Sequence, residues 1–184
     1  VLDRLTGPGS HRLDQRWHAY EGLQGSVEGN AVVFSGKPDA DDLPSLTLAA
    51  LPRHGLKTAI DEGWVSHQWY KKEPVDVAQF TLETEMPALF VTVLYPSPAG
   101  TSPPDVSVKP LPAQLDERDA GPNEATAFGV IVRDGTRTVN DLWLFRHAEK
   151  GVVMTGNTRL NGRMARVRLA RSEERRVGKE CATG

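Results

Sequence analysis

The run AFGVIVRDGTRTVNDLWLF (residues 127–145) indicates the fold class of this chain. Two apolar stretches, residues 127–133 and 138–145, flank the dipeptide Asp134-Gly135, and an Asp-Gly pair favours the positive φ angles of a tight hairpin turn. Neither stretch has the i, i+3, i+4, i+7 spacing of apolar residues that marks an amphipathic helix. The run therefore predicts two antiparallel strands joined by a short turn.

Similar short runs, rich in Val, Leu, Thr, Phe and Trp and bounded by Gly, Pro, Asn and Asp, recur on both sides of it. A second tight turn is predicted at Asn161-Gly162. Residues 96–105 and 111–125 are rich in proline, glycine and acidic side chains, which predicts exposed connections. Nothing predicts a crossover helix, so we expect an all-β fold, an antiparallel β-sandwich of about ten or more short strands. The strands are predicted at residues 1–5, 11–20, 26–35, 45–51, 56–60, 75–84, 88–95, 106–111, 127–133, 138–145, 151–155, 158–160 and 164–169.

Length and charge limit the organisation and the partners. The 184 residues suffice for one all-β domain, which we predict over residues 1–170. The formal net charge of -2 provides no broad basic field for a phosphate backbone, so no nucleic-acid partner is expected. No apolar run is long enough to cross a bilayer, so no membrane span is expected.

The last residues differ from the rest of the chain. RSEERRVGKEC (residues 171–181) breaks from the preceding apolar alternation and resembles the translation of a short-read sequencing adapter. We therefore expect residues 171–184 to be a non-native tail, although nothing in the resemblance accounts for residues 182–184. The single cysteine, Cys181, lies in this tail, so no cysteine chemistry is expected. The chain starts without Met or a signal-like stretch, and we expect it to be a piece of a longer protein.

Two histidines lie in GPGSHRLDQRWHAYEG (residues 7–22). Side chains alternate between the two faces of a strand, so His11 shares a face with Trp17 and His18 shares the polar face with Tyr20. The two histidines therefore cannot bind one metal ion. A solvated or structural role is the favoured interpretation of His18, and a contact to sugar is the alternative.

Aromatic residues concentrate in DEGWVSHQWYKKEP (residues 61–74). Trp64, Trp69 and Tyr70, near His67, could form a platform on which sugar rings stack, or they could be core aromatics at a sheet edge. Together with His18 and Tyr20 they are the candidate substrate-binding residues. No serine nucleophile elbow, phosphate-binding glycine loop or HExxH spacing is present, so we predict neither catalytic residues nor metal ligands in this chain.

Two separated segments resemble, in the same order, segments of bacterial heparinase II/III-like polysaccharide lyases. VLDRLTGPGSHRLDQRWHAYEG (residues 1–22) resembles the family's DR-x-x-G-x-G-x-H turn and the strand after it, which ends in Arg/Phe-Trp-His. EGWVSHQWYKKEPVDV (residues 62–77) with MPALFVTVLYP (residues 86–96) resembles its Gly-Trp-x-Ser segment, its Lys/Glu-x-Pro strand and its Thr-Val-Leu-Tyr-Pro strand. The likeness covers most of residues 1–96.

The resemblance implies a large periplasmic or secreted enzyme, in which an N-terminal α/α toroid precedes antiparallel β-sandwiches. Such enzymes degrade uronic-acid polysaccharides by β-elimination, which needs a group that neutralises the carboxylate, a base and an acid. In the family these groups belong to the toroid and to an early sandwich strand. Any structural zinc is bound by HGHAD-like and HNT-like motifs that precede the segment seen here. We therefore expect no cofactor in this chain.

Three hypotheses follow. The first is that the chain is the C-terminal β-sandwich of such a lyase, which supports the missing toroid, lines the cleft for an acidic polysaccharide and is inactive alone. The second is a noncatalytic carbohydrate-binding sandwich that uses the aromatic platform. The third is a purely structural domain that holds an interface to the toroid.

Overall fold

The computed structural model describes residues 1–38, 40 and 42–169, so the expected tail and Cys181 lie outside the described residues. Within them the regular elements are all strands, which confirms the all-β prediction. No helix of the described part is long and apolar enough to cross a membrane. The strands are β1 (Leu2–Leu5), β2 (Ser10–His18), β3 (Leu23–Glu28), β4 (Ala31–Gly36), β5 (Ser45–Ala50), β6 (Lys57–Gln68), β7 (Lys71–Glu85), β8 (Ala88–Ser97), β9 (Asp105–Leu111), β10 (Gln114–Leu115), β11 (Arg118–Asp119), β12 (Ala125–Asp134), β13 (Arg137–Arg146), β14 (Val153–Thr155), β15 (Thr158–Leu160) and β16 (Met164–Leu169).

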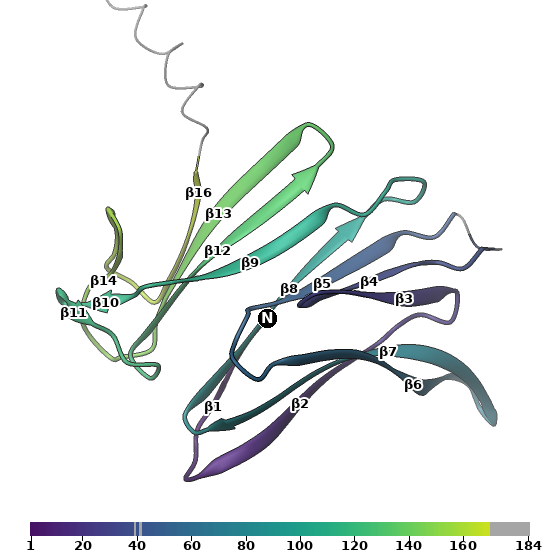
Figure 1. Ribbon diagram of the computed structural model, residues 1–184, viewed down its shortest axis with the longest axis horizontal. Coiled ribbons are helices and arrows are strands. Elements are labelled where there is room, and N and C mark those ends of the chain that lie inside the picture. The colour runs from purple at the N-terminus through teal and green to yellow at the C-terminus, as the bar shows by residue number, and fades with distance from the viewer. Residues whose placement is uncertain (39, 41, 170–184) are drawn as a thin grey trace, which may run out of the picture.

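The strands form four antiparallel sheets that stack in layers (Figure 1). A three-stranded sheet, β2-β7-β6, packs on a five-stranded sheet, β1-β8-β5-β4-β3. The other face of the five-stranded sheet packs on β16-β13-β12-β9, and the last sheet, β11-β10-β14-β15, covers the far face of that one. The predicted antiparallel sandwich is therefore confirmed, with four layers of sheet.

Each of the three interfaces between layers has its own apolar core. The two middle sheets are buried on both faces, so neighbouring side chains of one strand enter different cores. In β8, Phe90 belongs to the core against β7, whereas Val91 belongs to the core against β12. This two-sided burial accounts for the continuous apolar runs in β4, β5 and β8, because a strand that has no solvated face does not alternate with polar residues.

The predicted hairpin at Asp134-Gly135 is confirmed, since β12 and β13 pair from Ala125↔Arg146 to Asp134↔Arg137 and Gly135 has φ 53°. The hairpin predicted at Asn161-Gly162 is wrong. β15 pairs with β14 and β16 pairs with β13, so the chain changes sheets there instead of folding back on itself. The tight turn lies earlier, at Gly156, where φ is 52°.

Three further boundaries differ from the predictions. The single strand predicted over residues 26–35 is a hairpin of β3 and β4, which turns at Gly29 with φ 62°. The strand predicted over residues 56–60 extends through β6 to Gln68. The connection predicted over residues 111–125 contains the short strands β10 and β11, whose Leu115 enters the third core.

Candidate functional site

The β6–β7 hairpin presents most of the candidate residues. The two strands are long, with 12 and 15 residues, and they pair from Lys57↔Thr81 to Gln68↔Lys71, with a bulge between Val65 and Gln68. Trp69 and Tyr70 form the turn. Tyr70 has φ 66°, a left-handed conformation that is uncommon for a bulky residue.

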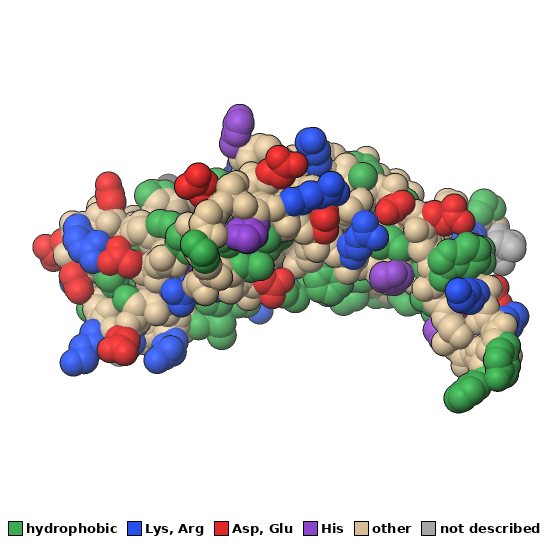
Figure 2. Space-filling model, turned by 90° about the horizontal axis from the view of Figure 1, so that it is seen from below, with side chains coloured by type: hydrophobic (Ala, Val, Ile, Leu, Met, Phe, Trp, Pro, Cys, Tyr) green, Lys and Arg blue, Asp and Glu red, His purple; other side chains and the backbone are tan. Residues whose placement is uncertain are grey.

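The turn of this hairpin holds its aromatic side chains in solvent. Trp69 is 88% exposed and Tyr70 is 98% exposed, while Trp64 on the strand is 54% exposed. An arm at the right-hand end of the space-filling view ends in hydrophobic side chains (Figure 2), on the side where Figure 1 places the β6–β7 turn. The interpretation of these residues as core aromatics at a sheet edge is therefore wrong for Trp69 and Tyr70.

The rings at the tip do not form one flat platform. The Trp69 and Tyr70 ring centroids lie 5.8 Å apart, and the planes make an angle of 66°. A single planar ligand ring can therefore lie flat on one of them and meet the other with its edge. The larger indole of Trp69 offers the wider apolar face.

Tyr20 and His67 come together from distant parts of the chain. Tyr20 follows β2 and His67 lies near the end of β6, and their ring centroids are 5.9 Å apart at 48°. Tyr20 is 52% exposed. The structure thus joins Tyr20, which follows the histidine-containing strand, to the aromatic hairpin. Two ring pairs, Tyr20–His67 and Trp69–Tyr70, and the exposed Trp64 make up the candidate residues there, which we call together the aromatic surface.

His18 has a different environment. It pairs with Val77 of β7, on the face opposite to Trp17, as the alternation predicts. A Cβ placed on Gly63 would lie 3.3 Å from His18 Cδ2 and 2.4 Å from Val77 Cγ2. The imidazole therefore lies over the β6 backbone at Gly63, where it helps to cover Val77, and this packing favours the structural interpretation of His18.

The polar face of β2 satisfies its own hydrogen bonds. Asp14 accepts hydrogen bonds from Thr81 Oγ1 at 2.6 Å, from Arg12 Nε at 3.1 Å and from Gln79 Nε2 at 3.2 Å. The Thr81 hydroxyl and the Arg12 guanidinium hold the pKa of this carboxyl below its ordinary value. Because these side chains bond to one another, this face of β2 is an ordinary hydrogen-bonded sheet surface.

Two lysines beside the turn were missed in the sequence analysis. Lys71 and Lys72 follow Tyr70 directly, and both are exposed. Lys71 Nζ lies 2.5 Å from Glu73 Oε1, and this hydrogen bond raises the pKa of the ammonium group. The run WYKK was the available signal, since cations next to exposed aromatic rings suit a ligand that carries both apolar faces and negative charge.

Among residues 1–38, 40 and 42–169 the structure contains no group of three or more His, Cys, Asp or Glu side chains that could hold a metal ion. His11, the other histidine of the β2 segment, contacts the Pro8 carbonyl oxygen through Nε2 at 2.9 Å. Comparison with family models, with curated proteins and with solved structures found no match to this chain.

Proposed function

We propose that this chain is the C-terminal β-sandwich part of a bacterial, periplasmic or secreted lyase that cleaves uronic-acid polysaccharides by β-elimination, and that it contacts the polysaccharide through the aromatic surface. The observation that carries the contact is the 88% and 98% exposure of Trp69 and Tyr70 at the hairpin turn. The lyase assignment rests on the two ordered segments that resemble the heparinase II/III-like family.

The chemistry of the aromatic surface suits an acidic sugar chain. Indole and phenol rings pack on the apolar C–H faces of pyranose rings, and burial of such a face releases the water that covers it. Lys72, next to the turn, provides positive charge for uronate carboxylates or sulfates, and Lys71, which is paired with Glu73, contributes less. Both lysines are exposed, so their attraction adds mainly at low salt.

The proposed role is contact without catalysis. The aromatic surface includes two tyrosines and a histidine, residue types that act as acid and base in eliminations. All three lie on an exposed hairpin and its neighbouring loop, whereas electrostatic catalysis requires a site that excludes water. The catalytic groups are assigned to the missing toroid and to an early sandwich strand, and any structural zinc to motifs upstream of this chain.

The binding test compares substitutions of two exposed apolar side chains. Trp69→Ala removes the more exposed of the two indole rings of the surface, and Met164→Ala removes a side chain that is 60% exposed on β16, outside the surface. We expect Trp69→Ala to weaken binding of heparan sulfate or alginate oligosaccharides at least tenfold in calorimetry, a loss of about 1.4 kcal/mol, and Met164→Ala to leave it unchanged. Both should keep the unfolding midpoint. Binding that survives Trp69→Ala contradicts the assignment of the surface.

A second assay tests the absence of catalysis. The purified chain is incubated with the same uronans, and the ultraviolet absorbance of the unsaturated product is followed. We expect no turnover. Clear product formation would show that this chain carries its own catalytic groups and would contradict the proposal that it only contacts the polysaccharide.

A further inference from the structure

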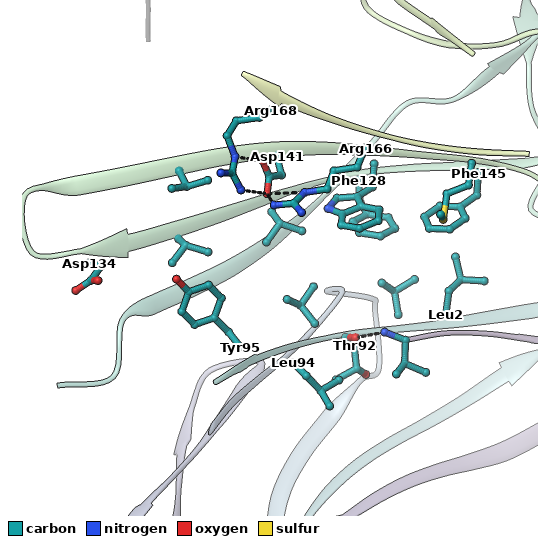
Figure 3. A pocket seen from close by; sticks show the side chains of 18 of the residues that line it. Leu2, Thr92, Leu94, Tyr95, Phe128, Asp134, Asp141, Phe145, Arg166 and Arg168 are labelled. Atoms are coloured by element: carbon teal, nitrogen blue, oxygen red, sulfur yellow. Dashed lines mark hydrogen bonds and ion pairs between the residues drawn. The ribbon is translucent and has the colours of Figure 1, made fainter. Parts of the chain in front are cut away.

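A cleft of about 660 Å³ opens between the β1–β8 side of the five-stranded sheet and the β12-β13-β16 sheet. Its walls are mainly apolar and belong to the second core, so part of that core reaches the surface. Figure 3 shows aromatic side chains of one sheet above the cleft and side chains of β8 and β1 below it. Its apolar lining includes Leu2, Val93, Tyr95, Phe128, Val130 and Trp143.

The lower wall contains an unpaired strand edge. β5 pairs with one edge of β8 from Ala50↔Thr92 to Ser45↔Ser97, whereas β1 pairs with the other edge only at Ala88–Val91. Beyond that, the Thr92 amide donates to the Val1 carbonyl at 3.0 Å, and the Val1 amino group donates to the Thr92 carbonyl at 2.7 Å. Within the described part of the chain, no strand pairs with this edge of β8 after Thr92.

The alternating hydrogen-bond directions along β8 determine which backbone groups point to this unpaired edge. In an antiparallel ladder every second residue directs both its N–H and its C=O to the same neighbour. Thr92 directs both toward β1, so Leu94 directs its N–H and C=O to the open side, and Pro96 directs its C=O there. Proline has no N–H, so the ladder can continue for about four residues before it ends.

Side-chain direction shows what a strand in this place would fill. Residues that face each other across a ladder lie on the same side of the sheet, as Leu2 and Val91 do in the second core. In a strand continuing β1, the positions opposite Val93 and Tyr95 would therefore point into the cleft. The opposite wall is a stack of Phe128, Trp143 and Phe145, with ring planes within 14° of parallel.

The charged groups at the rim favour a neutral occupant. Asp141 receives hydrogen bonds from Arg166 Nε at 3.0 Å and from Arg168 Nε at 2.9 Å, as the dashed lines in Figure 3 mark. Both guanidinium groups are therefore committed to this carboxylate. Asp134 and Arg137, which face each other across the β12–β13 ladder, add one charge of each sign to the lining. An anionic amphiphile would have to compete for them, whereas a peptide strand requires only the backbone edge and the apolar walls.

We propose that the cleft is the docking site of an extended polypeptide strand that continues β1 along β8, with apolar side chains opposite Val93 and Tyr95. Its occupant is the segment that precedes Val1 in the parent enzyme, and this assignment of the occupant rests on the proposed function. The strand pairs its backbone with Leu94 and closes the second core against Trp143.

The test adds four residues directly before Val1 in two arrangements of equal composition. Lys-Val-Thr-Val places valines opposite Val93 and Tyr95, whereas Val-Lys-Val-Thr places them on the other face. We expect the first extension to slow hydrogen exchange of the Leu94 amide at least about tenfold and to reduce the fluorescence of Nile red, an uncharged dye for apolar surfaces, about twofold. The second extension should have a clearly smaller effect on both.

Equal effects of the two extensions, or an unchanged Leu94 amide, overturn the proposal. It is also overturned if deletion of residues 170–184 from the unextended chain speeds exchange at Leu94, because the tail would then occupy the edge. A dimer of the unextended chain with a protected Leu94 amide would identify a second copy as the occupant and would also overturn the proposal. Neither readout involves saccharide, so failure of this proposal and failure of the proposed function are distinguishable.

Discussion

Asp141 on β13 lies between Arg166 and Arg168 of β16 and is only 8% exposed. Its carboxylate is hydrogen-bonded to both guanidinium groups, and these bonds, that from Arg168 first, hold its pKa below the ordinary value. Removal of the carboxylate leaves two arginines side by side without their shared anion. The cluster therefore fixes the edge strand β16 to the sheet.

We expect Asp141→Ala to lower the free energy of unfolding by about 2 kcal/mol, the usual range for hydrogen bonds to charged groups. The matched control is Asp105→Ala, which breaks an exposed ion pair with Arg133 and should cost less than about 0.5 kcal/mol. Urea unfolding of both variants measures the difference. Equal losses would mean that burial does not strengthen the Asp141 cluster.

Glu124 predicts a pH dependence of stability. Its hydrogen bonds with Arg118 and with the Gly121 amide lower the pKa of this carboxyl from 4.5 to about 2. Because the folded-state pKa is below the unfolded value, the stabilisation is present above pH 4.5 and is lost as the pH falls toward 2. Glu124→Gln should therefore destabilise the protein at about pH 6 but much less at about pH 3, as urea unfolding would show. A loss that is the same at both values would contradict this role.

At the level of single elements, the β6–β7 hairpin depends on Gly63. A Cβ there would lie 2.4 Å from Cγ2 of Val77, a buried residue of the paired strand. We expect Gly63→Ala to destabilise the protein by about 1–3 kcal/mol, because strand or side chain must shift. The control is Gly129→Ala in β12, where the nearest atom is an ordinary 3.8 Å away.

Gly129→Ala should be neutral or stabilising in thermal denaturation, since it removes the flexibility of glycine from a strand without a clash. If Gly63→Ala is equally well tolerated, the close packing of His18 and Val77 over β6 does not restrict the side chain at position 63. The variant also reports on the aromatic surface, because the same hairpin carries Trp69 and Tyr70.

Turn chemistry was sufficient to predict some elements and not others. Asp134-Gly135 lies between two apolar runs that pair with each other, so the local signal and the tertiary pairing agree. Asn161-Gly162 has an equally favourable dipeptide, yet the strands on its two sides enter different sheets. A local turn preference cannot predict this pairing, because the pairing depends on which sheet buries Leu160 and on which sheet pairs with β16.

For the whole molecule, the sequence predicted the class of fold but not the number of layers. Strands buried on both faces lack the alternation that would assign each side chain to one core, as Phe90 and Val91 illustrate. The candidate site was predicted in part, because exposed aromatics are visible as a local run. The contact between Tyr20 and His67 joins distant segments, and no local pattern could indicate it.

The central claim, contact with acidic polysaccharide through the hairpin turn, is tested most directly by the four tryptophan side chains. In a nitrogen-15 NMR titration with heparan sulfate oligosaccharides, each indole N–H gives its own signal. We predict that binding shifts the indole signal of Trp69 and, to a smaller extent, that of Trp64. The signals of Trp17 in the first core and Trp143 in the cleft should not change. A titration that moves none of the four signals, or that moves Trp143 instead of Trp69, would contradict the account.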